Sequence, residues 1–169
     1  QKTISKNPRS TVGTITEIYD FFRLLFARAS DAYSYNTGEK MVKFTTDQIV
    51  NLIIDQYQGK KLIILSPIVK GRKGHYKELL NQSIKQGFVK ARIDSEIQNL
   101  VPNMQLDRYK THDIEIVIDQ LKVKKEDQQR ITNSVNVALK HGKGTIMVVD
   151  VDENNYSLLS RNLMCPTTG

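Results

Sequence analysis

The apolar positions of the chain follow two spacings, and each spacing predicts a different kind of element. In four segments the apolar residues recur at steps of three and four, which is typical of a helix with one buried face. Thr14 with Glu17, and Thr45 with Gln48, have the spacing of a capping box at a helix start. We therefore expect helices over residues 14–28, 45–57, 74–86 and 129–140.

Glycines mark the ends of three of these helices. Gly59 and Gly142 follow the last periodic residues of the second and fourth helices. Gly87 follows the third, and we expect it to leave the helix in a left-handed conformation. The first helix carries six apolar residues on one face, which we expect to be buried against another surface: Ile15, Ile18, Tyr19, Phe22, Leu25 and Phe26.

Short apolar runs predict the strands. Residues 62–65 form a continuous apolar run, but Pro67 has no N–H to donate to a neighbouring strand. We therefore expect this strand to end near Ser66 or to bend at a sheet edge. Residues 31–38 are small and polar and predict a linker, and residues 40–44 alternate enough to predict a short strand.

Alternation is clearer in the middle of the chain. Over residues 88–94, period-two geometry places Val89, Ala91 and Ile93 on one face, which we expect to point inward. The pair Ser95–Glu96 predicts a turn into a further strand through residues 97–100, although it lacks the glycine typical of a two-residue hairpin.

A second alternating segment covers residues 113–119, where isoleucines alternate with Glu115, Val117 and Asp119. We expect Glu115 and Asp119 on the solvated face of a half-buried strand. Two more strands are predicted over 145–149 and 156–163. Because so many strands follow one another directly, a parallel doubly wound sheet is disfavoured. We predict an α+β fold with a mixed or mostly antiparallel sheet and helices packed mainly on one face.

The composition is that of an ordinary globular protein. The chain has 169 residues, of which 39% are hydrophobic and 25% are charged. No apolar run approaches the roughly 20 residues that a membrane-spanning helix needs, so we expect no membrane association. The single cysteine cannot form an internal disulfide and no signal-peptide pattern opens the chain, so the reducing cytoplasm is the expected compartment.

The net charge of +7 is concentrated in one part of the chain. Residues 60–92 contain nine Lys and Arg residues but only Glu78 as an acid, nine minus one, so they carry a net charge of +8 and the rest of the chain sums to −1. Such a cluster attracts an anionic partner in a salt-dependent way. The same run is also compatible with long basic side chains that only solvate a helix and two strand ends.

The best candidate site within this run is the loop VKGRKGH, residues 69–75. Gly71 and Gly74 bracket Arg72 and Lys73, so the loop can present both cations to solvent. A guanidinium forms paired hydrogen bonds with carboxylate or phosphate, whereas an ammonium acts as a point charge. If their strand lies beside the loop, Lys90 and Arg92 would extend the patch, with Asp94 placed to orient Arg92.

Several segments carry a family resemblance. NPRSTVGTITEIYDFFRLLFAR (residues 7–28) and the preceding QKTISK, together with LSPIVKGRKGHYKELL, GFVKARID, HDIEIVIDQLKV and CPTTG, resemble the UvrA family of the excinuclease ABC system. Members are damage-recognising ATPases of bacterial nucleotide excision repair. The resemblance implies a fragment: residues 1–30 from the first ABC-type ATP-binding domain, 31–155 an inserted domain that docks the excinuclease protein UvrB, and 156–169 a return strand. It also implies that the apolar face of the first helix is exposed without its neighbouring domain.

The resemblance also implies roles for particular residues. Arg72, Lys73 and Arg92 match the family's contact motifs for UvrB, and three further members of the patch would be Lys70, Lys90 and Asp94. The intact parent would bind DNA and form a homodimer.

The same resemblance implies ATP and zinc for the intact parent. Gln1 matches the glutamine that senses the nucleotide in ABC-type enzymes. This chain, however, has no GxxxxGK[ST] phosphate loop, so we expect no ATP hydrolysis by the fragment. The family's CPxCG segment reads CPTTG here, with Thr168 in place of the second cysteine, so we expect no zinc site.

Two other classes of function compete with protein docking. Non-specific binding to the DNA backbone by the same basic patch is the alternative, because phosphate contacts need only clustered Lys and Arg. Catalysis is disfavoured, since the three histidines His75, His112 and His141 are scattered and no Ser or Cys has the setting of an activated nucleophile.

Overall fold

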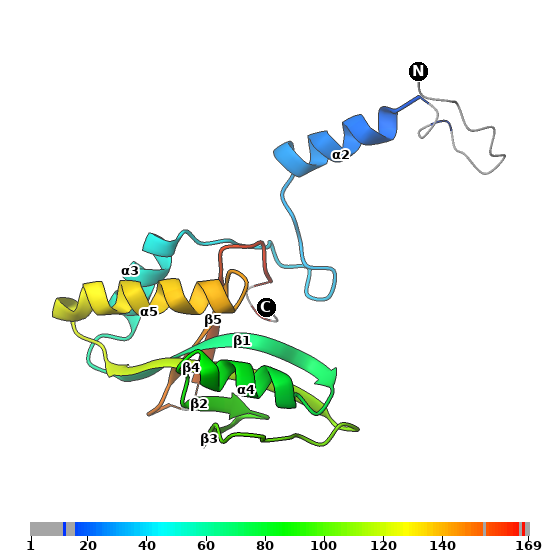
Figure 1. The fold of residues 1–169 in the computed structure, drawn as a ribbon. Helices are drawn as coiled ribbons and strands as arrows, with labels where there is room; N and C mark the ends of the chain where they lie inside the picture. The colour runs from blue at the N-terminus through cyan, green and yellow to red at the C-terminus, as the bar shows by residue number, and fades with distance from the viewer. Residues whose placement is uncertain (1–11, 13–15, 154, 166, 168–169) are drawn as a thin grey trace.

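Six strands form one open antiparallel sheet with the order β3-β2-β4-β1-β5-β6. The computed structural model describes residues 12, 16–153, 155–165 and 167 of the chain. Figure 1 shows the long, bent β1 and β4 at the centre of the sheet, α4 and α5 against it, and α2 standing apart. The elements are α2 (Ile18–Ala29), α3 (Thr46–Gln56), β1 (Lys61–Lys73), α4 (Lys77–Lys85), β2 (Lys90–Ile93), β3 (Glu96–Asn99), β4 (Thr111–Lys122), the 3-10 turn η1 (Lys125–Asp127), α5 (Gln128–His141), β5 (Thr145–Asp150) and β6 (Asn155–Ser160).

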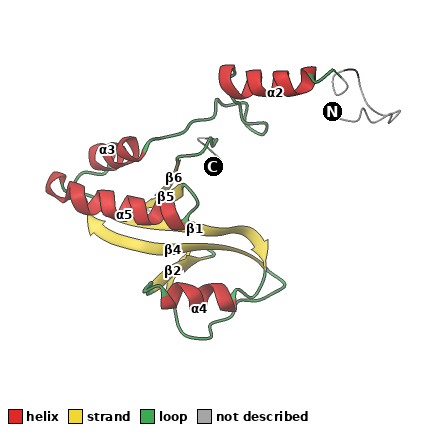
Figure 2. Cartoon of the chain, turned by 45° about the horizontal axis from the view of Figure 1, so that its top comes forward, coloured by secondary structure: helices red, strands yellow, loops and turns green. Residues whose placement is uncertain are grey.

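The predicted α+β class is confirmed, with every strand pair antiparallel. Helices α3 and α5 pack through Ile53 and Val135 on the inner residues of β1 and β5, and α4 packs through Leu80 on β2 and β4. Figure 2 shows these helices on one side of the sheet. The starts and ends of α3 and α5 lie within one residue of those predicted, and both bonds of the capping box of Thr45 form. Helix α4 begins three residues after the predicted start, behind a left-handed Tyr76, and is followed by Gly87 with φ +93°.

The opposite face of the sheet carries a small core of its own. Ile63 and Leu65 of β1 are buried there against Met147 and Val149 of β5. Arg92 of β2 approaches the Met147 sulfur at 3.5 Å and lies 5.8 Å from the ring centre of Tyr156, although β4 and β1 separate these strands in the sheet. The sheet is therefore curved, and its helix-free face is concave.

Two outcomes were expected at Pro67. An end of the strand near Ser66 is wrong, because β1 continues to Lys73, but a bend where the strand becomes a free edge is found. Beyond Leu65 the strand has lost its neighbour β5 and pairs only with β4. Pro67 lies in this part, next to register shifts. Only one neighbouring strand is present there, so the missing N–H of proline does not remove a hydrogen bond between two central strands.

One of the three orientations predicted for residues 88–94 was also wrong, while Ala91 and Ile93 are buried as expected. Val89 lies outside β2 and is 69% exposed, whereas Phe88 packs against the core beneath α4. Ile97 of β3 is exposed as well. A turn into β3 does form, but it consists of Asp94 and Ser95 instead of the predicted Ser95 and Glu96, and Glu96 begins β3. Asp94 and Ser95 both adopt positive φ, of 50° and 76°, as a two-residue hairpin requires even without glycine.

The N-terminal part differs from the rest. Residues 40–44 form no strand of the sheet but make isolated bridges, Tyr33 with Lys40 and Val42 with Met164. Helix α2 begins at Ile18 after a left-handed Glu17, and none of its residues is buried. The predicted capping residue Thr14 lies outside the described residues.

Candidate partner-binding site at the tip of β1 and β4

Exposed cations gather where β1 ends beside the start of β4. Lys70, Arg72 and Lys73 come from β1, and Arg72 pairs with His112 while Lys73 pairs with Thr111. Arg108 and Lys110 precede β4 in a loop that contacts the β1 end, where the Leu106 N–H donates to the His75 carbonyl at 2.9 Å. We call the five cations the basic tip: Lys70, Arg72, Lys73, Arg108 and Lys110.

The backbone of the basic tip is held in place by hydrogen bonds. Gly71 has φ +59°, and its N–H donates to the Asp113 carboxylate at 2.6 Å. The Tyr76 hydroxyl lies 3.0 Å from the Arg72 carbonyl oxygen and 3.2 Å from that of Lys73. These contacts fix the loop while both cationic side chains extend into solvent. Neither Arg72 nor Lys73 forms an ion pair with a carboxylate of the described residues.

His112 joins the elements beneath the basic tip. Its Nδ1 lies 2.6 Å from the Asp94 carboxylate and its Nε2 lies 2.8 Å from the Asp107 carbonyl oxygen. Both ring nitrogens therefore face acceptors, which only the doubly protonated imidazolium satisfies. The hydrogen bond with Asp94, then that with Asp107, raises the pKa of His112. The Asp94 pKa is lowered: partial burial opposes this, but bonds from His112 and the Asp113 N–H outweigh it.

Arg92 has a different setting from the one expected for a docking cation. Its guanidinium lies 3.3 Å from the Glu115 carboxylate and 3.3 Å from the Ser95 hydroxyl, and its side chain is only 15% exposed. Asp94 does not orient Arg92, because it is bound to His112 instead.

Glu115 was expected on a solvated face, and this was wrong: its side chain is 6% exposed. The burial of Glu115 follows from the strand register, because Arg92 of β2 lies directly opposite Glu115 of β4 on the concave face. Burial raises the pKa of Glu115, and the charge of Arg92 offsets part of that rise. Asp119 is also partly buried, and its carboxylate accepts hydrogen bonds from Arg130 and Ser134 of α5.

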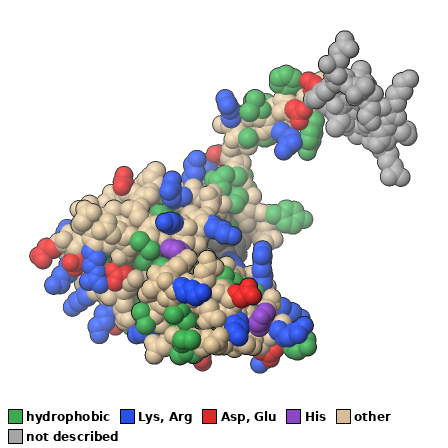
Figure 3. Space-filling model, viewed as in Figure 1, with side chains coloured by type: hydrophobic (Ala, Val, Ile, Leu, Met, Phe, Trp, Pro, Cys, Tyr) green, Lys and Arg blue, Asp and Glu red, His purple; other side chains and the backbone are tan. Residues whose placement is uncertain are grey.

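The predicted patch is therefore divided. Lys90 is exposed but begins β2, four residues from Asp94 and so roughly 13 Å along the strand from the end that meets the basic tip. Figure 3 shows Lys and Arg side chains together with a His at the end of the domain toward which the β1 arrow points. It also shows basic side chains at the opposite end, where exposed Lys61 and Lys122 pair across β1 and β4.

Two members of the basic tip were missed by the sequence reasoning. Arg108 and Lys110 lie outside residues 60–92, in a segment with no regular periodicity. Their place follows from the pairing of Thr111 with Lys73, a contact between segments far apart in the chain. The available signal was the DRYK sequence directly before the strongly alternating strand.

The other sequence candidates lie elsewhere. Gln1 is outside the described residues. Cys165 is buried, with its sulfur 3.2 Å from the Thr37 hydroxyl and 3.4 Å from the Glu39 carboxylate. The described part of the chain holds no group of three or more His, Cys, Asp or Glu side chains placed to bind a metal. Among the same residues, no helix has the length and apolar character needed to cross a membrane.

Comparison with known proteins assigns the family. The sequence profile of the family described as the UvrA interaction domain matches residues 45–152, more than half of the chain and nearly all of the sheet. The chain belongs to the UvrA interaction domain family. The inferred resemblance to UvrA is thus confirmed, and the matched residues contain all five cations of the basic tip.

Whole proteins of the UvrA type are similar along the full chain. UvrABC system protein A of Aquifex aeolicus is 40% identical over 169 residues, that of Thermus thermophilus 39% over 171, and that of Bacillus subtilis 42% over 169. In each case the whole chain is aligned, and it spans 18% of the length of the relative. The UvrA interaction domain described here thus corresponds to a small part of those proteins.

Proposed function

We propose that this UvrA interaction domain docks UvrB, a protein of the bacterial nucleotide excision repair system, through the basic tip. The observation that carries the proposal is the solvent-facing pair Arg72 and Lys73 on a backbone fixed by Gly71 and Tyr76. A fixed backbone lowers the entropy lost on binding, because little of the loop has to be ordered. The relatives' name, UvrABC system protein A, supports a partner within the same system.

The partner surface that fits the basic tip is acidic. Arg72 supplies a planar fork for a bidentate carboxylate contact, and Lys73 with Lys110 supplies charge around it. Such a surface speeds association and sets register, and its contribution falls as salt rises. Arg92 and Asp94 take a secondary part in this proposal. They hold the β2–β3 hairpin beside the basic tip, through Glu115 and His112 respectively.

The test compares two double variants that each remove two exposed cations from the same strand pair. Arg72→Ala with Lys73→Ala removes charge at the basic tip, and Lys61→Ala with Lys122→Ala removes it at the far end of β1 and β4. Purified UvrB is titrated with each by calorimetry at low and moderate salt. We expect the tip variant to bind at least about tenfold more weakly, or 1.4 kcal/mol, and the control to bind normally. Equal affinity for the two variants would refute the proposal.

Binding to the DNA backbone remains the alternative, and the five exposed cations of the basic tip favour it as a second candidate. Each phosphate contact that is lost reduces the steepness of log affinity against log salt concentration by roughly 0.9. An electrophoretic shift with duplex DNA at moderate salt separates the two functions. If the tip variant loses DNA binding but keeps its affinity for UvrB, the DNA function replaces the docking function.

We also propose that the chain alone does not hydrolyse ATP, since no GxxxxGK[ST] segment occurs in its 169 residues. The backbone cradle for the β and γ phosphates is therefore missing. Phosphate release from ATP by the purified chain, measured above the level of a heat-treated sample, would contradict this.

A further inference from the structure

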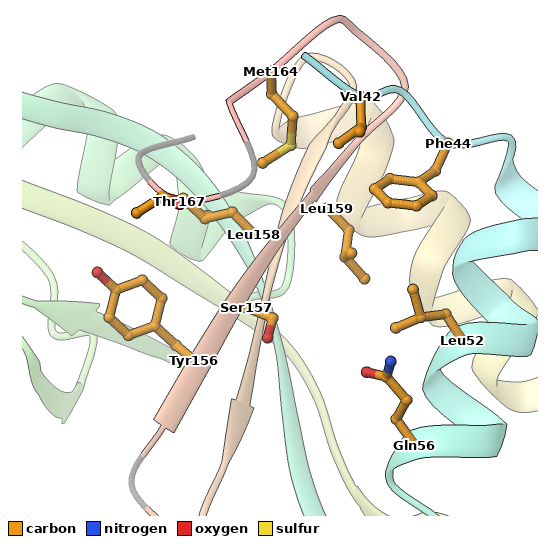
Figure 4. A pocket seen from close by; sticks show the side chains of 10 residues that line it. All are labelled: Val42, Phe44, Leu52, Gln56, Tyr156, Ser157, Leu158, Leu159, Met164 and Thr167. Carbon is orange, nitrogen blue, oxygen red and sulfur yellow. The ribbon is translucent and has the colours of Figure 1, made fainter. Parts of the chain in front are cut away.

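Strand β6 forms one edge of the sheet, and a groove of about 240 Å³ lies beside it. Leu52 and Gln56 of α3 and Phe44 form one wall of the groove. The opposite wall consists of four consecutive residues of β6, Tyr156, Ser157, Leu158 and Leu159, and the lining is completed by Val42, Met164 and Thr167. Figure 4 shows Leu159 directed toward α3, with Tyr156 and Leu158 directed to the other side of the strand.

The groove runs along the outer edge of β6. Consecutive side chains of a strand point to opposite faces, yet side chains from both faces of β6 line this one groove. A single hollow can meet both sets only where it wraps around the free side of the strand. The groove therefore has the position that a seventh strand would occupy.

The peptide groups at this edge have the required direction. The Phe44 N–H donates to the Ser160 carbonyl from outside the sheet at 2.8 Å, whereas the next residue, Arg161, donates inward to the Gly144 carbonyl. Because the direction alternates along a strand, the peptide groups of Leu158 and Tyr156 also point outward. In the described part of the chain, β5 is the one strand that pairs with β6.

Acidic side chains flank the end of the groove at which β6 begins. Asp152 and Glu153 are exposed in the turn that leads into β6, and Asp55 is exposed next to Gln56 of α3. Lys60 pairs with both Asp150 and Glu153, and the Lys61 carbonyl accepts from the Val151 N–H at 3.0 Å, so two lysines balance only part of the charge of the four carboxylates. On a chain of net charge +7, this end of the groove favours a basic group rather than an acidic one.

We propose that the β6 edge binds an extended segment of a partner protein as an added strand. Its backbone pairs with Leu158 and Tyr156, its apolar side chains fill the groove against Leu52, and a basic side chain lies over the turn at Asp152. Strand addition of this kind takes affinity from main-chain hydrogen bonds and specificity from alternate side chains. A second copy fits less well: pairing two β6 edges antiparallel would bring a second α3 to the same side of the groove.

The test uses a synthetic probe and the 15N-labelled chain. The capped peptide Lys-Val-Thr-Val-Thr-Val-Lys is titrated while amide shifts are followed, and a peptide with both lysines replaced by glutamate is the control. We expect saturable shifts centred on β6 and at least fivefold weaker binding of the acidic peptide. Absence of saturable shifts up to the solubility limit, or shifts centred elsewhere, would overturn the proposal.

Two variants sharpen the result. Leu158→Pro removes an outward N–H while leaving the bonds to β5 in place, and we expect it to lose peptide binding. Asp152→Lys changes an exposed turn residue, so it should fold normally and weaken the preference for the lysine peptide. An unchanged preference contradicts the charge argument. Sedimentation that shows a concentration-dependent dimer, abolished by Leu158→Pro, would instead make a second copy the occupant and overturn the proposal of a partner segment.

Discussion

Raising the pH from about 6 to about 9 is expected to destabilise the end of the domain that carries the basic tip, because His112 loses a proton. The pKa of His112 is raised by its hydrogen bonds to Asp94 and Asp107 from an ordinary value of 6.5. A raised pKa contributes stability that is complete below the ordinary value and is lost as the pH rises through the raised value. The lowered pKa of Asp94 acts at the acid end, where its stabilisation is lost as the pH falls below the ordinary 3.8.

The size of the effect follows from the two hydrogen bonds. A neutral imidazole keeps one N–H, so one of its two acceptors loses its donor. A hydrogen bond to a charged group contributes about 1.5–3 kcal/mol to the free energy of unfolding. The Asp94 side chain is 48% exposed, so the lower end of that range applies. We expect a loss of about 1.5 kcal/mol, or roughly 3–6 °C in the melting temperature of a domain of this size.

The assay is urea unfolding of the wild-type chain and of His112→Gln at both pH values. Glutamine can still donate to the Asp107 carbonyl but does not titrate. All other titratable groups are shared by the two proteins, so their contributions cancel in the difference between the two free energies of unfolding. The wild type should be more stable than the variant at pH 6, and the gap should narrow at pH 9. A gap that is the same at both pH values would refute the imidazolium assignment, as would an NMR titration showing His112 singly protonated at pH 6.

Three further predictions concern stability. Thr45→Ala should lower the free energy of unfolding by about 1 kcal/mol in urea, because the capping box is lost; an unchanged midpoint would contradict the cap. Gly142→Ala should cost more than about 2 kcal/mol, since a Cβ there would lie 2.0 Å from the Thr145 carbonyl oxygen, and normal thermal stability of that variant would show that the turn can relax. Arg92→Met should cost about 3 kcal/mol by leaving Glu115 buried without a partner. Adding Glu115→Met should recover part of that loss in a double-mutant cycle, and additive losses would show that the pair is not coupled.

Local signals in the sequence predicted the helices well. The capping box of Thr45 and the left-handed Gly87 depend on residues close together in the chain, so spacing alone locates them. The expected class of fold followed from the same patterns. The sequence left two outcomes open at Pro67, a strand end or a bend at an edge, because the choice depends on where β5 stops pairing with β1, which no local pattern records.

The candidate site was predicted only in part. Arg72 and Lys73 were found because glycines flank them, and both are exposed. The burial of Glu115 and the pairing of Arg92 arise from the register of β2 on β4, together with the curvature of the sheet. Arg108 and Lys110 reach the basic tip through pairing between distant strands. Contacts of this kind are set by the tertiary fold rather than by spacing along the chain.

The central position of β1 has a consequence for how the domain is made. Leu62 pairs with Asp150, about 90 residues later in the chain, which at roughly 5–20 residues per second takes several seconds to synthesise. During that interval the apolar run of β1, residues 62–65, lacks its final neighbour β5. Refolding in vitro should accordingly be slow for a domain of this size, as non-local topologies are, and aggregation during expression should be most sensitive to substitutions in residues 62–65.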